Sequence, residues 1–216
     1  MRVSPLEKEL LGKGYRYIAG IDEAGRGAWA GPVVAGAVIL PLDNPEICLA
    51  LVDVCDSKKL KPEERERLFE LISSAAISWG VGFVPPERID QVGIVKATRE
   101  AMVLAISQLN PPPQFLLIDY LYLPEVPFPQ EAITSGDASC LSIAAASIVA
   151  KVMRDQWMVA MDKLFPGYGF SEHKGYGTPQ HREALKKLGP CPIHRASFAP
   201  LRLFHNFFTA SWHNSK

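Results

Sequence analysis

Hydrophobic positions along the chain fall into short runs separated by longer amphipathic stretches. The runs at 15–22, 31–41 and 77–85 are rich in β-branched or aromatic residues and are bounded by Gly or Pro, which predicts β-strands. A further run at 114–123 places four apolar residues before Asp119, so we expect this strand to be buried. A short segment joins the first two strands, which favours a hairpin-like, antiparallel pair.

The amphipathic stretches predict helices. Over 57–76, Pro62 lies in the first turn, and Leu68, Leu71 and Ile72 lie on one face. Further helices are predicted over 86–109, 138–164 and 179–189. The longest of these is dense in Ala and Ser, whose small side chains allow close packing against a sheet.

The order of the predicted elements is β-β-helix-β-helix-β-β-helix, with 131–137 as the last strand segment. This order predicts an α/β domain with a mixed central sheet flanked by helices. The 216 residues are enough for one such domain with a sizeable core. We expect the domain to span 1–199, with a C-terminal tail over 200–216 that includes a helical segment.

Composition narrows the class of protein. Apolar residues make up 48% and charged residues 21% of the chain, as in globular proteins. No window approaches 18 uncharged apolar residues, and the N-terminus carries acids without an apolar signal core, so we expect neither membrane insertion nor secretion. The four cysteines are scattered without a CxxC pair, which favours reduced thiols in a cytoplasmic protein.

Charge is distributed unevenly along the chain. Residues 1–137 hold 13 Lys+Arg and 19 Asp+Glu, whereas residues 138–216 hold 10 Lys+Arg, 4 Asp+Glu and all five histidines. A polyanion could therefore be bound by the second part while acids of the first part act on it. Chance variation between helix surfaces is the alternative interpretation.

Three acids stand at the ends of predicted elements. Asp22 lies near the carboxyl end of the first strand, Asp119 lies in the buried strand, and Asp137 immediately precedes the long helix. Carboxylates that meet in one cleft repel one another, and a buried carboxylate without a partner is costly. Divalent cations such as Mg²⁺ take oxygen ligands of this kind, so a cation is the natural compensation.

Each acid also has a purely structural interpretation. Asp137 can cap the N-terminus of the long helix, and Asp119 can be a solvent-exposed residue at a strand end. Adjacent strand residues point to opposite faces, so Asp22 and Glu23 share one site only if the strand ends there. The glycines that follow favour such an ending.

The segment GRGAWA (25–30) matches the G-x-G-x-x-G/A pattern of dinucleotide-binding folds. That pattern requires a helix that opens at the glycines, whereas Gly31, Pro32 and a β-branched strand follow here. The acids Asp22 and Glu23 would also face the diphosphate without a cation. The dinucleotide-binding interpretation therefore fails on its context.

The segment GIDEAGRGAWAGPVVAGAVIL (20–40) resembles the opening motif of ribonuclease HII, the type 2 ribonuclease H family. The resemblance continues in order along nearly the whole chain. It runs through DSKKL (56–60), PPERID (85–90), IVKATREAM (94–102), FLLIDY (115–120), SGD (135–137), SIAAASIVAKVMRD (142–155), FPGYGFSEHKGYGTPQH (165–181) and HRASFAP (194–200).

The resemblance implies a ribonuclease H-like fold and an endonuclease that cuts RNA strands of RNA–DNA hybrids and single ribonucleotides embedded in duplex DNA. Cleavage on the 5′ side of the ribonucleotide leaves 5′-phosphate and 3′-hydroxyl ends, a step of ribonucleotide excision repair. The alternative is a protein of the same fold that binds hybrids without cutting them.

The resemblance further implies that the catalytic, metal-binding carboxylates are Asp22, Glu23, Asp119 and Asp137. They are expected to hold two ions of Mg²⁺ or Mn²⁺. In two-metal catalysis one ion activates the attacking water and the other stabilises the leaving oxygen.

By the same resemblance, backbone groups of Gly25, Arg26 and Gly27 contact the ribose 2′-hydroxyl, because missing side chains permit close approach. Tyr176 matches the family tyrosine that packs on the sugar at the RNA-to-DNA junction, although a lone loop tyrosine more often anchors its loop. Candidate phosphate contacts are Ser57, Lys58, Lys174 and Arg195. Taken alone, the two lysines would be solvated surface residues.

Departures from the family pattern are few. Ser135 stands where Lys is frequent, Gly93 where Asn is common, and Tyr120 where Gly is common. None of these removes a metal ligand. Cys191-x-x-His194 is only half of a zinc-binding pattern, so we expect no separate zinc site.

The tail loosely resembles the short peptides that dock onto DNA sliding clamps, but their leading Gln is missing. Its apolar residues are Leu201, Phe204, Phe207 and Phe208. Their i, i+3, i+6, i+7 spacing favours instead a helix that packs on the core. Nothing in the sequence requires more than a monomer.

Overall fold

The structure is a computed structural model that describes residues 3–54, 57 and 60–203. Two compact units emerge, each assembled from separate stretches of the chain. Unit 1 draws on Met1–Ala24, Val34–Phe83 and Arg99–Met153, and unit 2 on Gly25–Val33, Val84–Thr98 and Arg154–Lys216. The predicted boundary between a domain over 1–199 and a tail over 200–216 stays a prediction, because residues 204–216 lie outside the described part.

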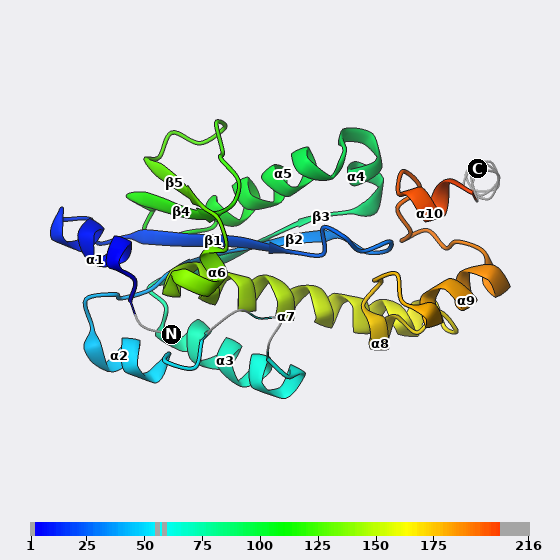
Figure 1. The fold of residues 1–216 in the computed structure, drawn as a ribbon, viewed down its shortest axis with the longest axis horizontal. Coiled ribbons are helices and arrows are strands. Elements are labelled where there is room, and N and C mark those ends of the chain that lie inside the picture. The colour runs from blue at the N-terminus through cyan, green and yellow to red at the C-terminus, as the bar shows by residue number, and fades with distance from the viewer. Residues whose placement is uncertain (1–2, 55–56, 58–59, 204–216) are drawn as a thin grey trace. The chain divides into compact units, whose positions relative to one another are not determined.

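A five-stranded sheet has the order β3-β2-β1-β4-β5 (Figure 1). Its strands are β1 (Ile18–Ala24), β2 (Val33–Ile39), β3 (Ser78–Val84), β4 (Phe115–Asp119) and β5 (Gln130–Ile133). β1 pairs antiparallel with β2 and parallel with β4, and β4 pairs parallel with β5. The predictions of a mixed sheet and of an antiparallel first pair are therefore confirmed.

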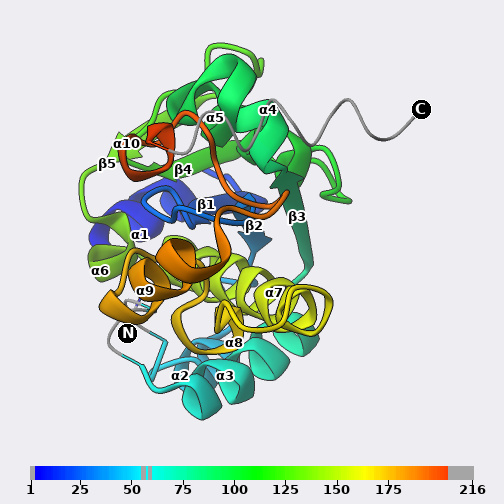
Figure 2. The same ribbon diagram turned by 90° about the vertical axis from the view of Figure 1, so that its right-hand side faces the viewer.

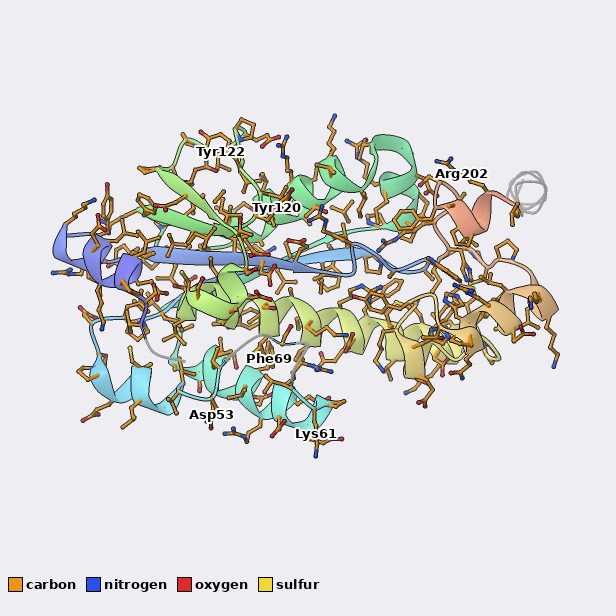
Figure 3. All side chains as sticks on the ribbon, viewed as in Figure 1. Asp53, Lys61, Phe69, Tyr120, Tyr122 and Arg202 are labelled. Carbon is orange, nitrogen blue, oxygen red and sulfur yellow. The ribbon has the colours of Figure 1, made fainter. Side chains whose placement is uncertain are left out.

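The strand predicted over 114–123 is shorter in the structure, because β4 ends at Asp119. The next residue, Tyr120, has a φ of 61°, a left-handed conformation that does not continue a strand. The side chains of Tyr120 and Tyr122, labelled in Figure 3, are exposed, whereas Leu121 between them is buried. The strand end thus coincides with the acid that the sequence marks as a candidate ligand.

The helices are α1 (Pro5–Gly12), α2 (Pro45–Ala50), α3 (Pro62–Ala75), α4 (Pro86–Val92), α5 (Ile94–Ile106), α6 (Gly136–Ser139), α7 (Leu141–Leu164), α8 (Phe170–His173), α9 (Pro179–Leu188) and α10 (Ala199–Arg202). The single helix predicted over 86–109 is two helices, divided at Gly93, whose φ is 80°. The long predicted helix begins at Leu141, because Cys140 adopts an extended conformation after the short α6.

Among the helices that were not predicted from the sequence, α1 and α2 carry capping signals. In α1 the Ser4 hydroxyl accepts the N–H of Glu7, and the Glu7 carboxylate accepts the N–H of Ser4, which forms a capping box. In α2 the Asn44 side chain accepts two backbone N–H groups. The Glu7 carboxylate also accepts the N–H of Ser142 at 2.9 Å, so it caps the first turn of α7.

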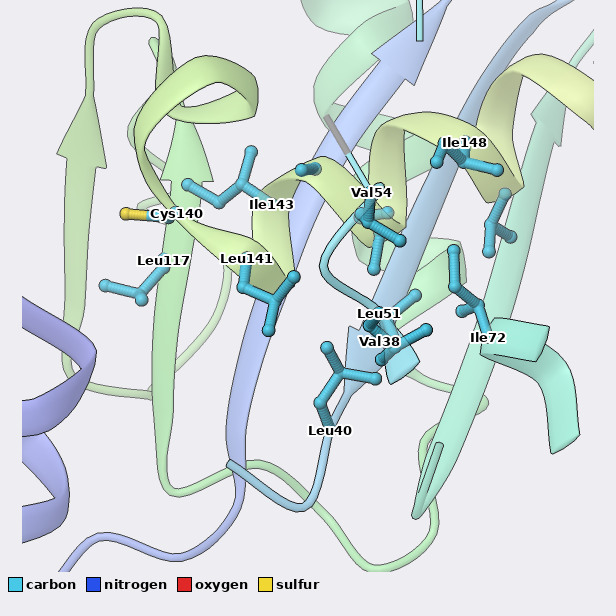
Figure 4. Close-up of a cluster of buried hydrophobic side chains, with 14 of the residues drawn as sticks. Val38, Leu40, Leu51, Val54, Ile72, Leu117, Cys140, Leu141, Ile143 and Ile148 are labelled. Atoms are coloured by element: carbon cyan, nitrogen blue, oxygen red, sulfur yellow. The ribbon is translucent and has the colours of Figure 1, made fainter. Parts of the chain in front are cut away.

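The first half of α7 packs directly on the sheet of unit 1. A Cβ added at Gly20 of β1 would lie 2.0 Å from the Ser142 carbonyl carbon, and one at Gly36 of β2 would lie 2.5 Å from the Ala146 oxygen. Small residues on both sides therefore allow helix backbone to contact strand backbone, as the Ala- and Ser-rich sequence predicts. Figure 4 shows the adjoining core, in which Val38, Leu51, Ile72, Leu141 and Ile148 are buried.

Unit 2 has a smaller core of its own. Its buried apolar residues include Met158 of α7, Leu185 of α9 and Leu201 of α10, and the rings of Tyr168 and Phe170 stack at 5.2 Å. α8 and α9 lie side by side in this unit (Figure 2). Leu201 thus packs on the core as expected, whereas the other apolar tail residues lie outside the described part of the chain. No helix among the described residues is long and apolar enough to span a membrane.

Candidate active site

Parallel pairing of β1 with β4 brings two of the predicted acids to neighbouring positions. The last registered pair of this ladder is Ile21 with Ile118, and Asp22 and Asp119 each follow directly. Residues at equivalent positions of adjacent strands project to the same face of a sheet. The fold therefore places Asp22 beside Asp119, although 96 residues separate them in the chain.

Asp22 is buried, with 4% of its surface exposed. Burial, followed by the negative charges of Glu23 and Asp119, raises the pKa of Asp22 well above its usual value. Two further carboxylates repel the charged form of this buried carboxyl, and a bound cation would reduce that repulsion. Among the residues that the structure describes, no three His, Cys, Asp or Glu side chains are already arranged around a metal position.

Several hydrogen bonds hold Asp22 in place. Its Oδ1 accepts the backbone N–H of Glu23 at 2.7 Å, and the Ser147 hydroxyl of α7 donates to its carboxylate. The Ser147 hydroxyl lies 2.9 Å from the hydroxyl of Ser57, and both serines are buried. Ser57, predicted to contact phosphate, therefore has its hydroxyl in a buried network behind Asp22. Its predicted neighbour in phosphate binding, Lys58, lies outside the described residues.

Glu23 lies within β1, which continues to Ala24 and pairs Glu23 with Ala35. The strand thus extends two residues beyond its predicted end at position 22, and it ends directly before Gly25, so Asp22 and Glu23 both stand among its last three residues. Glu23 is half-buried, and its charge nevertheless raises the pKa of Asp22. The two adjacent acids thus interact electrostatically at the carboxyl end of β1.

Asp137 lies inside α6 and is buried, with 7% of its surface exposed. The N-cap position of α6 is occupied by Ser135 in a left-handed conformation, with φ 57°. The interpretation of Asp137 as a simple helix cap is therefore excluded. The residue before it, Gly136, donates its backbone N–H to Asp119 Oδ1 at 2.7 Å, which joins this turn to the end of β4.

The Gly-Arg-Gly turn follows β1 in the chain and belongs to unit 2. Gly25 has a φ of 91°, and a Cβ there would lie 2.0 Å from Nε of Arg154. Gly27 differs, because a Cβ there would meet no atom within 4 Å and its φ is not in the left-handed range. The fold therefore requires glycine at position 25 but not at position 27.

Arg154 of α7 is a buried connector within unit 2. Its guanidinium donates to the carbonyls of Pro32, Lys174 and Ala30 at 2.9, 3.0 and 3.0 Å. It also lies 5.2 Å from the centre of the Tyr176 ring. Burial lowers the pKa of Arg154, and the three carbonyl dipoles are the groups that hold its charge.

The other predicted substrate residues also lie in unit 2. Arg195 is fully buried and donates from Nε to the Gly31 carbonyl and from Nη1 to the Arg26 carbonyl, at 2.9 and 3.0 Å. Burial lowers the pKa of Arg195 to about 9. Lys174 is half-buried with a φ of 52°, and its Nζ donates to the Ser171 carbonyl. Arg195 thus stabilises the Gly-Arg-Gly turn through its hydrogen bond to the Arg26 carbonyl.

Three supporting residues were not singled out from the sequence. Arg154 lies near the middle of α7, close to the charged residues Lys151 and Asp155. Asp90 accepts the backbone N–H groups of Ala196 and Ser197 at 2.8 and 2.9 Å, and so anchors the HRASFAP segment. Ser147 lies on the face of α7 toward Asp22. All three stand inside or beside the quoted motifs, but their partners are remote in sequence.

Residues 19–201 match the ribonuclease HII family. The chain is 52% identical to ribonuclease HII of Geobacillus kaustophilus (strain HTA426) over 196 residues, which cover 91% of this chain and 73% of that protein. It is 54% identical to ribonuclease HII of Roseiflexus castenholzii (strain DSM 13941 / HLO8) over 198 residues, which cover 90% and 87% of the two chains.

Solved structures agree with this similarity. The crystal structure of ribonuclease H2 from Pyrococcus horikoshii OT3 superposes with a TM-score of 0.73 at 29% identity, covering 89% of this chain and 98% of that one. The PCNA:RNase HII complex from Archaeoglobus fulgidus superposes with a TM-score of 0.70 at 28% identity, covering 86% and 96%.

The mixed sheet, with acids at the adjoining ends of β1 and β4, therefore defines a nuclease of the ribonuclease H-like fold. Within that class, the chain belongs to the ribonuclease HII family. It is accordingly an enzyme, an endonuclease that acts on RNA–DNA hybrids. The alternative of a hybrid-binding protein without catalysis is disfavoured, because all four acids are present.

Proposed function

We propose that this enzyme cuts on the 5′ side of ribonucleotides, both in RNA–DNA hybrids and at single ribonucleotides embedded in duplex DNA. The products are 5′-phosphate and 3′-hydroxyl ends, which fit a role in ribonucleotide excision repair by a cytoplasmic monomer. The observation that carries the proposal is the buried Asp22 carboxyl, placed against the charges of Glu23 and Asp119 in a ribonuclease HII chain.

The donor set fits divalent metal ions. We assign Asp22, Glu23, Asp119 and Asp137 as the residues that hold Mg²⁺ or Mn²⁺, because hard cations prefer carboxylate oxygens. Two bound ions supply an activated water and charge stabilisation for the leaving 3′-oxygen. The protein's own contribution is to hold the acids: Ser147 orients Asp22, and the Gly136 N–H orients Asp119.

Recognition of RNA is assigned to the Gly-Arg-Gly turn and Tyr176. The open space at Gly27 supports this assignment, because internal packing does not explain why a glycine stands there. Close approach of a sugar 2′-hydroxyl to the backbone of Gly25, Arg26 and Gly27 does explain it. The half-buried ring of Tyr176 then packs on the deoxyribose that follows the ribonucleotide.

Two of the predicted phosphate contacts, Ser57 and Arg195, have buried side chains, and we assign them roles in supporting other site residues. Ser57 supports Asp22 through Ser147, and Arg195 supports Arg26 through its carbonyl. Lys58 and Lys174 stay proposed phosphate contacts, since lysines near a nucleic acid act mainly through their charge.

The test is cleavage of end-labelled duplex DNA that carries one ribonucleotide, with Mg²⁺, Mn²⁺ or EDTA. We expect a single cut 5′ to the ribonucleotide with either metal and none with EDTA. A uniform RNA–DNA hybrid is the matched second substrate. Cleavage of the hybrid but not of the single-ribonucleotide duplex would contradict the proposed single-ribonucleotide activity. Cleavage in EDTA would contradict the proposed metal dependence.

A sliding clamp is a second proposed partner. The structure from Archaeoglobus fulgidus holds a ribonuclease HII in complex with PCNA, and this chain carries an aromatic run near its C-terminus. Leu201 is part of the core, so the test is deletion of 204–216 only. We expect the full chain to bind a purified clamp and the shortened chain not to bind. Equal binding by both chains, or binding by neither, would end this proposal.

A further inference from the structure

Three buried histidines of unit 2 lie next to one another behind the loop that carries Tyr176. His173 ends α8, His181 lies in the first half of α9, and His194 follows Cys191 in the next segment. The rings of His173 and His181 stack with centroids 4.4 Å apart and planes 12° apart. Nε2 of His181 lies 3.0 Å from Nε2 of His194.

The proton positions on His181 and His194 follow from their neighbours. The Cys191 backbone N–H donates to Nδ1 of His194 at 2.9 Å. An amide N–H can only donate a hydrogen bond, so Nδ1 of His194 must be the acceptor and carries no proton. The Cys191 carbonyl lies 3.1 Å from the same nitrogen, but it already accepts the His194 backbone N–H at 3.0 Å. A neutral His194 therefore carries its proton on Nε2 and donates it to His181.

The contact between His181 and the Tyr176 carbonyl independently gives the same proton positions. Nδ1 of His181 lies 3.0 Å from the Tyr176 carbonyl, which can only accept, so this Nδ1 carries the proton. A neutral His181 then has an unprotonated Nε2, which is the acceptor that His194 requires. The relay runs in one direction: Cys191 N–H to His194, His194 to His181, and His181 to the Tyr176 carbonyl.

His173 completes the support on the other side of the loop. The Gly175 N–H donates to Nδ1 of His173 at 3.2 Å, so Nε2 of His173 carries the proton and donates to the Tyr168 carbonyl at 2.8 Å. The Tyr176 N–H donates to the His173 carbonyl at 2.9 Å. Both backbone groups of Tyr176 are thus bonded to histidines of this cluster.

The surroundings keep the relay neutral and rigid. The ring of Phe170 lies 5.6 Å from those of His181 and His194, and the ring of Trp29 lies 5.6 Å from that of His181. A proton added to His181 would set two N–H groups against each other at the 3.0 Å contact with His194. An apolar, buried setting of this kind disfavours the added charge.

We infer that His181 and His194 are positioning residues for ribonucleotide recognition: their one-way hydrogen-bond relay fixes the Tyr176 carbonyl and so the place where the Tyr176 ring meets the sugar. The inference rests on the proposed role of Tyr176 in contacting substrate. The Tyr176 carbonyl also accepts the backbone N–H of Thr178 at 2.8 Å. Because the inferred effect on cleavage passes through Tyr176, loss of the relay and loss of the Tyr176 ring should not be additive.

The test is a double-mutant cycle on cleavage of duplex DNA with one ribonucleotide. His181→Leu removes the donor, whereas His181→Asn keeps an N–H near the position of Nδ1. We expect His181→Leu to lower kcat/KM by about 10-fold or more, because small misplacements in a site are costly. His181→Asn should recover most of that loss. In a Tyr176→Ala background, His181→Leu should change kcat/KM by less than about twofold.

An equal loss from His181→Leu in both backgrounds, or no recovery by His181→Asn, would show a merely structural role and overturn the inference. If Tyr176→Ala itself leaves cleavage unchanged, the proposed role of Tyr176 fails, and the inference falls with it. Nitrogen-15 NMR of the histidine rings tests the relay without any variant. We expect protons on Nδ1 of His181 and on Nε2 of His194 and His173; an Nε2-protonated His181 would contradict the relay.

Discussion

Asp119 accepts the backbone N–H of Gly136 on its Oδ1 at 2.7 Å, which ties the end of β4 to the turn that presents Asp137. A Cβ at Gly136 would lie 2.5 Å from Cδ1 of Ile143, so this turn packs tightly on α7. A carboxylate can accept several bonds, so this bond does not prevent Asp119 from binding a cation. The bond therefore fixes the Asp119 carboxylate relative to the turn that carries Asp137.

The two glycines of the Gly-Arg-Gly turn should respond differently to alanine. Gly25→Ala places a Cβ against the Arg154 side chain at positive φ, so we expect a loss of roughly 1–3 kcal/mol of unfolding free energy. Gly27→Ala meets no atom, so its unfolding free energy should stay within about 0.5 kcal/mol of wild type.

Activity should respond to the change at Gly27 even though stability does not. Gly27→Ala should lower kcat/KM about 10-fold or more, because the new methyl group occupies the space assigned to the ribose. Urea unfolding and cleavage of the single-ribonucleotide duplex measure the two effects. A Gly27→Ala enzyme with full activity would show that the backbone there does not approach the sugar.

Ser147→Ala should weaken metal binding without removing a ligand. The Ser147 hydroxyl bonds to Asp22 and lies 2.9 Å from that of Ser57, so its loss releases the carboxylate that it orients. Loss of such outer partners costs about 10–100-fold in metal affinity or activity. Activity titrated with Mg²⁺ should require correspondingly more metal. Ser74→Ala, which removes an exposed hydroxyl bonded to Leu71, is the control and should titrate as wild type.

Arg154→Lys should destabilise the protein although charge is conserved. A single ammonium cannot reproduce the three bonds from the guanidinium to Pro32, Lys174 and Ala30. Buried carbonyls left without a donor cost about 1–3 kcal/mol each, so we expect a loss of roughly that size or more. Arg67→Lys, at an exposed ion pair with Asp53, is the control. Equal stability of both variants in urea unfolding would contradict the role assigned to Arg154.

The buried histidines should make stability fall in acid. Burial lowers the pKa of His181 to about 4 and of His194 to about 3, while unfolded histidine titrates near 6.5. The unfolded state therefore binds more protons below pH 6.5, and stability is lost as pH falls toward these values, by up to about 1.4 kcal/mol per pH unit for each histidine.

The Asp22 carboxyl, whose pKa is raised, acts in the opposite direction, so the histidine effect is read from a difference. His194→Gln removes one titrating ring and keeps an N–H near the position of Nε2. Urea unfolding at pH 7.5, 6.0 and 5.0 should show a steeper loss for wild type than for this variant. Identical pH dependence of the two proteins would contradict burial of a neutral His194.

Local sequence patterns predicted most of the sheet and the long helices, because strand alternation and helical spacing are properties of neighbouring residues. The breaks at Gly93 and Cys140 were missed, since apolar spacing continues across both. The short α1 and α2 were missed although Ser4 and Asn44 are good N-caps. β4 ends at Asp119 because Tyr120 adopts a left-handed backbone conformation, which the presence of a tyrosine does not predict.

The candidate acids could be selected from the sequence because the motifs around Asp22, Asp119 and Asp137 are long and specific, and their role as metal ligands stays a prediction. The residues that support these acids and the substrate-binding loops could not be predicted from the sequence. Arg154 and Arg195 are bonded to backbone carbonyls, which every residue possesses, so no side-chain pattern marks their partners. The same holds for the Tyr176 carbonyl and His181, whose relation appears only when α9 packs against its loop.

The central claim is that the carboxylates perform metal-dependent cleavage, and one variant tests it most directly. Asp119→Asn keeps the shape of the side chain and an acceptor for Gly136 but removes the charge. We expect nicking of the single-ribonucleotide duplex with Mg²⁺ or Mn²⁺ to fall by about 10²–10³-fold or more, while affinity for an RNA–DNA hybrid largely persists. Asp53→Asn, at an exposed ion pair, should nick as wild type. Unchanged nicking by Asp119→Asn would contradict the account.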